Sequence, residues 1–201
     1  NGYHFIQFDA FPAKLASYTG MNVGIMSDVL KAGCLSVTPP GGTLGKVEFT
    51  GLGGVKWAVP GNVDYGTSIS IKFLEFSGLP ILKIMHGWVK MMRDYRTGIA
   101  FSGGDSPQYS KKDYAANLTY CTTSPDVQLV EFGAFYDGIF PLKDPQDLFS
   151  SDVETVGRID TEIEFNVDYA WTDETWVNKK CEALAQAAYD ADKTVNAYGQ
   201  A

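Results

Sequence analysis

The run 158–171, RIDTEIEFNVDYAW, constrains the fold more than any other part of the chain. Apolar and polar side chains alternate along it, which is typical of a β-strand with one buried face and one face in water. At about 3.3 Å per residue, the run predicts a single strand of roughly 45 Å. We expect its core-facing side to hold Ile159, Thr161, Ile163, Phe165, Val167, Tyr169 and Trp171.

The opposite side of this strand carries a row of carboxylates: Asp160, Glu162, Glu164 and Asp168. Residues two positions apart on a strand have Cα atoms about 6.6 Å apart. A calcium ion needs six to eight oxygen ligands at about 2.3–2.6 Å, so one strand alone cannot enclose it. We therefore predict no metal site and no cofactor.

A glycosidase pair is geometrically possible in this row, because carboxyl groups about 5–9.5 Å apart serve that chemistry. A β-sandwich carbohydrate hydrolase that uses Glu162 and Glu164 is therefore one hypothesis. The aromatic side chains that a sugar site needs lie on the other side of the strand. The chain also has no GxSxG elbow, no Walker loop and no GxGxxG between a strand and a helix. We expect a protein that is not an enzyme.

Three further interpretations of the acidic row involve no catalysis. DNA carries a phosphate about every 1.7 Å of its axis, so an acidic wall would keep it from adhering to a passage through which it slides. The row also suits a contact between subunits, or an ordinary face in water.

The rest of the chain predicts a mainly β domain. Adjacent glycines at 51–54 allow the positive φ angles of a tight turn, which indicates a hairpin over 47–59. Alternation predicts a strand over 67–76, and two further strands are expected over 114–122 and 127–136.

A helix is predicted over 80–96, because Pro80 suits its first turn and Gly98 suits its end. Its broad apolar face would pack on a sheet. The opposite face is a basic stripe that either meets an acidic partner or is solvated: Lys83, His86, Lys90 and Arg93. A second helix is predicted over 173–192.

Charge is unevenly distributed along the chain, whose net charge is −8. Residues 31–112 have ten Lys and Arg against five Asp and Glu, whereas residues 126–173 have two against twelve. This asymmetry favours association between copies, unless the two segments interleave in space. No run of about 18 apolar residues is present, so we expect no membrane anchor. The three cysteines (Cys34, Cys121 and Cys181) are far apart in sequence and predict free thiols.

The order of these elements resembles that of the tail tube proteins of contractile-tailed, myovirus-type phages, which are related to type VI secretion tube proteins. The resemblance covers about Lys31–Trp171. It is carried by the Gly-rich hairpin leading into VPGNVDYG, by the helix that follows, by the motif at Tyr136–Pro141 and by the closing Asp168–Trp171.

The resemblance implies a small β-barrel, or two packed antiparallel sheets, with one flanking amphipathic helix. It divides the chain into a strand-poor N-terminal arm over 1–30, a tube-type β-barrel domain over 31–171 and a C-terminal helical extension over 172–201. The basic stripe would then meet the sheath, and the acidic row would line the lumen or a contact between rings.

The function that the resemblance implies is structural. Six copies close into a hexameric ring, each giving strands to a shared inner barrel, and rings stack head to tail. The implied partners are other copies, the sheath protein, the baseplate and tail terminator proteins, and the tape measure protein and DNA in the lumen. The implied place is the phage virion, assembled in the cytoplasm of the bacterial host. A tube of a type VI secretion system or of a phage-like injection particle is the alternative within this fold.

Overall fold

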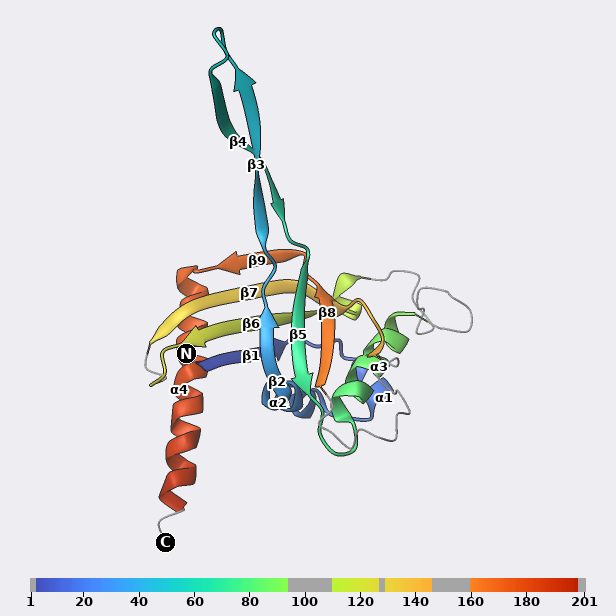
Figure 1. Cartoon of the computed structure of the whole chain (residues 1–201). Helices are drawn as coiled ribbons and strands as arrows, with labels where there is room; N and C mark the ends of the chain where they lie inside the picture. The colour runs from blue at the N-terminus through green and yellow to red at the C-terminus, as the bar shows by residue number, and fades with distance from the viewer. Residues whose placement is uncertain (1–2, 94–109, 127–128, 146–159, 199–201) are drawn as a thin grey trace, which may run out of the picture.

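Antiparallel strands make up the body of the molecule (Figure 1). The computed structural model describes residues 3–93, 110–126, 129–145 and 160–198. The strands of the body are β1 (Tyr3–Asp9), β2 (Cys34–Thr38), β5 (Ser68–Leu74), β6 (Ala116–Thr123), β7 (Val130–Pro141), β8 (Asp160–Asn166) and β9 (Tyr169–Thr172). They pair in the order β1-β6-β7-β8-β5-β2, and β9 pairs with β7. The strands predicted over 67–76, 114–122 and 127–136 thus correspond to β5, β6 and β7.

The strands form two layers whose directions cross (Figure 1). One layer contains β1, β6, β7 and β9, and the other contains β2, β5 and β8. Strand β7 belongs to both, because most of it pairs with β6 while Phe140 and Pro141 pair with β8. The predicted mainly β architecture of two packed antiparallel sheets is confirmed. The sheet does not close into a hydrogen-bonded barrel, since the end strands β1 and β2 do not pair within the described residues.

The bend that takes β7 from one layer to the other lies in the Tyr136–Pro141 motif. Gly138 has φ +73°, a left-handed conformation that glycine adopts without a steric penalty. A Cβ at Gly138 would also collide with the Asp168 carboxylate. The motif is therefore a corner inside one strand.

The single long strand expected over 158–171 is wrong. Its described part divides into β8 and β9, which belong to different layers. At the break, the Val167 amide donates to the Thr67 carbonyl at 2.7 Å, and the Asp168 amide donates to Asp137 at 3.0 Å. The chain thereby leaves its place beside β5 and joins β7.

This break changes which side chains reach the core. Ile163, Phe165 and Val167 are buried as expected, whereas Tyr169 is 66% exposed, because β9 lies in the other layer. Trp171 is half-buried in a separate cluster. Ile159 lies outside the described residues.

The N-terminal segment is part of the sheet, so the expectation of a strand-poor arm over 1–30 is corrected. Strand β1 pairs with β6 along its whole length and places Ile6 and Phe8 in the main core. Helices α1 (Leu15–Thr19) and α2 (Val23–Gly33) follow it and bury Leu15, Met26 and Leu30. The division of the whole chain into three domains stays a prediction.

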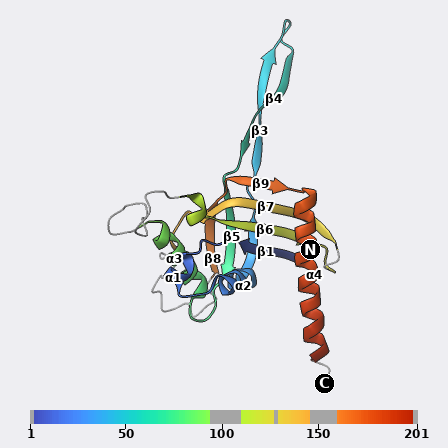
Figure 2. The same cartoon turned by 180° about the vertical axis from the view of Figure 1, so that it is seen from behind.

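Two elements extend away from the body in opposite directions, as both views show (Figures 1 and 2). The predicted hairpin is present as β3 (Gly42–Thr50) and β4 (Lys56–Tyr65), and it continues the lines of β2 and β5. The predicted C-terminal helix is α4 (Thr175–Tyr198), whose first half lies against β6 and β7. Within the described residues, no helix is long and apolar enough to cross a membrane.

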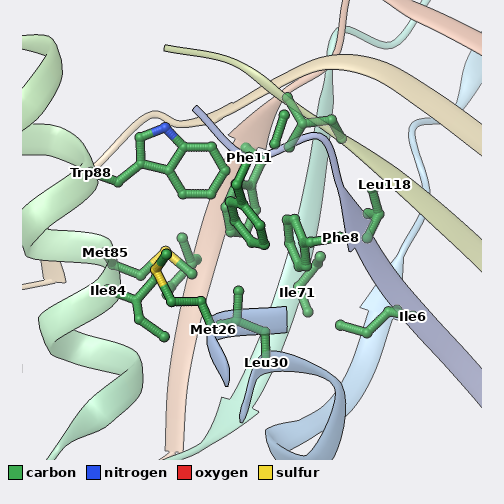
Figure 3. Close-up of a cluster of buried hydrophobic side chains, with 14 of the residues drawn as sticks. Ile6, Phe8, Phe11, Met26, Leu30, Ile71, Ile84, Met85, Trp88 and Leu118 are labelled. Carbon is green, nitrogen blue, oxygen red and sulfur yellow. The ribbon is translucent and has the colours of Figure 1, made fainter. Parts of the chain in front are cut away.

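Helix α3 (Pro80–Met92) closes the core, and Figure 3 shows its side chains pointing at those of β1. The helix starts as predicted, with Pro80 in its first turn. The Glu75 carboxylate accepts from the Ile81 and Leu82 amides at 3.0 and 2.9 Å, which satisfies two donors at the helix start. The predicted residues 94–96 of this helix lie outside the described residues.

Trp88 is the largest fully buried side chain of this core. Its ring packs edge-on against Phe8 and Phe11, with centroids 6.3 and 5.4 Å away. Its Nε1 donates to the Tyr114 carbonyl at 2.6 Å. Its ring also lies 6.3 Å from that of Phe165 in β8, so Trp88 ties α3 to both layers of the sheet.

We expect Trp88→Ala to lower the free energy of unfolding by about 3–5 kcal/mol, because it leaves a large cavity and an unpaired carbonyl. Chemical denaturation followed by circular dichroism measures the change. Lys83→Ala, on the exposed side of the same helix, is the control and should change stability by less than about 0.5 kcal/mol. A loss below about 1 kcal/mol for Trp88→Ala would contradict this account of the core.

Candidate functional site

The hairpin β3–β4 exposes an apolar surface that the described part of the chain does not cover. The strand register places Val47 opposite Val59 and Phe49 opposite Trp57, so these four side chains share one face of the ribbon. Their exposed fractions are 46%, 41%, 44% and 52%. In the described part of the chain, β3 and β4 pair only with each other. We call these four residues the hairpin apolar face.

The opposite face of the ribbon is polar. Lys46 and Glu48 form an ion pair at 2.6 Å there, and both side chains are mostly exposed. The hairpin is therefore amphipathic although neither of its faces lies on the body. An isolated two-stranded ribbon is marginally stable in water, so an uncovered apolar face of this kind is typical of an interaction surface.

The turn of the hairpin fits closely around the aromatic rings of Phe49 and Trp57. The rings of Phe49 and Trp57 stack with centroids 6.2 Å apart. The Gly51 amide donates to the Val55 carbonyl at 2.8 Å and closes the turn, and Gly53 and Gly54 have positive φ angles. A Cβ on Gly51 would collide with the Trp57 ring. Glycine at 51 thus allows Trp57 to lie against the turn.

A second candidate surface is the polar outer face of β2, β5 and β8. Glu162 and Glu164 are exposed there, opposite Lys72 and Ser70 in the register. Lys72 pairs with Asp160 at 3.2 Å, and the Ser70 hydroxyl donates to Glu162 at 2.7 Å. Three members of the predicted acidic row are therefore brought together, and one lysine partly balances them. We call Asp160, Glu162 and Glu164 the acidic face.

Asp168, the fourth predicted member, lies apart from the acidic face. It follows the break after β8, where it pairs with Lys111 and accepts from Asn166 Nδ2 at 2.9 Å. Lys111 begins the short helix η1 (Lys111–Asp113). Asp168 therefore helps to hold the corner of β7 in place.

A cavity of about 650 Å³ lies beside this corner. Its charged lining comes from Lys111, Lys112, Asp137 and Asp168. Neither Glu162 nor Glu164 lines it, so the carboxylates of the hydrolase hypothesis lie on an open face. Within the described residues, no cluster of His, Cys, Asp and Glu could hold a metal ion.

The predicted basic stripe is interrupted in the structure. Lys83 and Lys90 are exposed on α3 and Arg93 is exposed just after it, whereas His86 is half-buried and its Nδ1 lies 3.0 Å from Asp144. Together with Lys72–Asp160 and Lys111–Asp168, this contact joins the basic segment 31–112 to the acidic segment 126–173. The charge asymmetry of the sequence is thus partly balanced within one chain.

Sequence reasoning missed two groups of residues that the fold brings together. One is an aromatic cluster of Phe135, Trp171 and Trp176, whose ring centroids are 5.1–6.2 Å apart. The other is the pair Cys121 and Cys181, which are adjacent in a small buried cluster. Their separation in the sequence hid both. The one usable signal was the apolar stripe of the predicted C-terminal helix, which includes Val177 and Cys181.

Comparison with known proteins reveals distant structural similarity. No protein-family model matches the chain. No curated protein sequence gives a significant match. Two solved structures resemble it over most of its length. One is the sheath–tube complex of an extracellular contractile injection system, PVC, in the extended state, with 14% identity, a TM-score of 0.46 and coverage of 86% of this chain and 88% of that chain. The other is the baseplate of the anti-feeding prophage, with 12% identity, a TM-score of 0.48 and coverage of 84% and 89%.

A chain of the PVC sheath/tube terminator is also similar, with 15% identity, a TM-score of 0.43 and coverage of 70% of this chain and 85% of that chain. Similarity at these identities and TM-scores does not establish a shared function.

We expect Trp57→Ser to change the free energy of unfolding of the monomer by less than about 0.5 kcal/mol, since the side chain is half exposed and its hairpin pairs with no other strand. Chemical denaturation at low protein concentration tests this. A loss of 2 kcal/mol or more would mean that the hairpin packs on its own chain in solution.

Proposed function

We propose that this protein is a structural subunit that assembles with copies of itself, and specifically the tube subunit of a contractile phage tail. The observation that carries the proposal is the hairpin apolar face, which the described residues of the body leave in water. Full burial of such side chains is worth about 1.5–3 kcal/mol each, and these are about half exposed. Covering the face in an assembly would therefore contribute about 1 kcal/mol per side chain.

The edges of the layer formed by β2, β5 and β8, which we call the upright layer, support assembly side by side. Strand β2 is the end of the strand order. On β8, only Phe165 and Asn166 pair with β7, so the backbone of residues 161–163 has no strand on that side within the described residues. Free strand edges are templates for pairing with another chain. Joining β2 of one copy to β8 of the next would build a continuous wall, and a heterologous contact of this kind gives a ring when the rotation between copies closes.

The two opposed extensions support stacking of such rings. The hairpin leaves the body at one end and α4 leaves it at the other (Figures 1 and 2). In a head-to-tail stack, the hairpin of each copy reaches the copy above it, where its apolar face becomes buried. Together with the resemblance to tail tube proteins, this arrangement favours hexameric rings stacked into a tube.

The acidic face supports DNA as the cargo of the tube. In a wall built from β2, β5 and β8, the outer polar face carries Asp160, Glu162 and Glu164, opposite the buried side of the layer. We infer that this face lines the lumen and keeps DNA from binding to the wall. The implied partners are the sheath, baseplate, tail terminator and tape measure proteins.

The assembly proposal predicts that purified protein forms rings or tubes as its concentration rises. Phe49→Ser with Trp57→Ser should raise the concentration needed for assembly about 30-fold, from a loss of about 2 kcal/mol per contact. Sedimentation velocity and negative-stain microscopy measure this. Lys46→Ala with Glu48→Ala, on the polar face of the same hairpin, is the matched control and should assemble normally. A folded wild-type protein that stays monomeric at high concentration would overturn the proposal.

The lumen assignment predicts a gain of DNA binding when Asp160, Glu162 and Glu164 are all replaced by Lys. Tubes of this variant should retain double-stranded DNA at low salt, whereas wild-type tubes should not. Co-sedimentation of labelled DNA with assembled tubes measures the difference. The control replaces three exposed acids by Lys, Glu174 just before α4 and Glu182 and Asp190 within it, and so changes the charge equally. If the first variant cannot form rings, the acidic face lies in a subunit contact and does not line the lumen.

A further inference from the structure

Helix α4 is attached to the body through a small core that is built around two cysteines. Cys181 of α4 and Cys121 of β6 are fully buried, together with Val177. Phe5, Val130, Phe135 and Trp171 surround them. This cluster is separate from the main core between the two layers.

Several contacts fix the two sulfur atoms beside each other. The thiols of Cys121 and Cys181 hydrogen-bond to one another. Cys181 Sγ also donates to the carbonyl of Tyr120, the residue before Cys121, at 3.7 Å. On the neighbouring strand, Gly133 lies opposite Cys121, and a Cβ there would come within 3.0 Å of Cys181 Sγ. The helix can approach so closely because residue 133 has no side chain.

The two thiols differ in chemistry. The hydrogen bond that Cys121 donates lowers the pKa of Cys181, and the charge of Lys180 lowers it further. The pKa of Cys121 is raised, because the same hydrogen bond holds its proton and burial disfavours its thiolate. Lys180 is the neighbour of Cys181 in the sequence, so its charge favours the Cys181 thiolate also when the helix is undocked, and Cys181 is the nucleophile of the pair. Cys34 lies in β2, outside this cluster, and burial raises its pKa to about 12.

We propose that Cys121 and Cys181 are a disulfide-forming site that fastens α4 to the sheet when the protein meets a small-molecule disulfide. The Cys181 thiolate attacks one sulfur of the oxidant, whose S–S bond breaks and releases one thiolate. The Cys121 thiol then gives up its proton to solvent, and its sulfur attacks Cys181 Sγ and displaces the second small thiol. Two protein thiols are oxidised to one disulfide, and one small disulfide is reduced to two thiols.

Burial controls access to this site. Neither sulfur can be reached while α4 is docked, so exchange requires α4 to lift from β6 and β7 by local opening. Once formed, the bond joins positions sixty residues apart and opposes that opening. The proposal concerns the single chain and does not depend on the proposed function.

The test is incubation of the full-length protein with oxidised glutathione, followed by intact mass measurement and a non-reducing peptide map. We expect a mass lower by two hydrogen atoms and one linked peptide that contains Cys121 and Cys181. Cys34→Ala should give the same product, whereas Cys121→Ala and Cys181→Ala should each abolish it. Limited proteolysis should release α4 at least about 10-fold more slowly from the oxidised wild-type protein than from the reduced one.

Three results would overturn the proposal. The first is a stable glutathione adduct on Cys181 that Cys121 does not displace. The second is a disulfide that involves Cys34 or joins two chains. The third is the absence of a Cys121–Cys181 disulfide at urea concentrations where α4 alone is sensitive to protease. Because all three are read on the wild-type protein, a variant that folds poorly does not affect the decision.

Discussion

The structure depends on one corner, the bend of β7 at Gly138. Here a strand that pairs with β6 turns to pair with β8, so the same segment holds both layers together. The corner is stabilised from the side, because Asn166 Nδ2 donates to the Gly138 carbonyl at 3.3 Å and Asp168 pairs with Lys111. The left-handed φ of Gly138 and the proximity of Asp168 leave room only for glycine. Without this bend, the crossed layers could not share a core around Trp88.

The corner also determines which surfaces remain for other molecules. It separates β8 from β9, so the acidic face ends where the chain changes layers. It leaves the upright layer of β2, β5 and β8 with its polar side in water and its apolar side against α3. The hairpin β3–β4 extends this layer past the body, and its apolar face then lies beyond the reach of the core. A subunit of an assembly is expected to combine a body whose apolar side chains are buried with an extension whose apolar side chains are exposed.

Charge and sulfur chemistry illustrate how folding changes the meaning of sequence patterns. The basic and acidic segments look like opposite halves of an interface, yet Lys72–Asp160, His86–Asp144 and Lys111–Asp168 join them inside one molecule. The cysteines look isolated, yet Cys121 and Cys181 share a cluster because α4 returns across β6. In both cases, contacts between distant parts of the chain decide the local chemistry.

Local patterns were sufficient for most elements. Alternation identified β5 and β8, strands were also expected where β6 and β7 lie, the glycines at 51–54 identified the hairpin turn, and Pro80 marked the start of α3. These signals succeed because side-chain periodicity and allowed φ angles are properties of a few consecutive residues. The same reasoning failed at β1, whose apolar residues are ordered by pairing with β6, more than a hundred positions away. It also failed at Val167–Asp168, because a change of layer leaves the alternation of the sequence intact.

The sequence by itself therefore determined that this is a mainly β protein with a Gly-turned hairpin, an amphipathic helix and an acidic strand. Only the tertiary structure decided that the acidic strand is two strands, that Asp168 supports a corner and that the hairpin's apolar face is uncovered. The physical reason is that exposure and pairing depend on which distant segments meet. No local pattern contains that information.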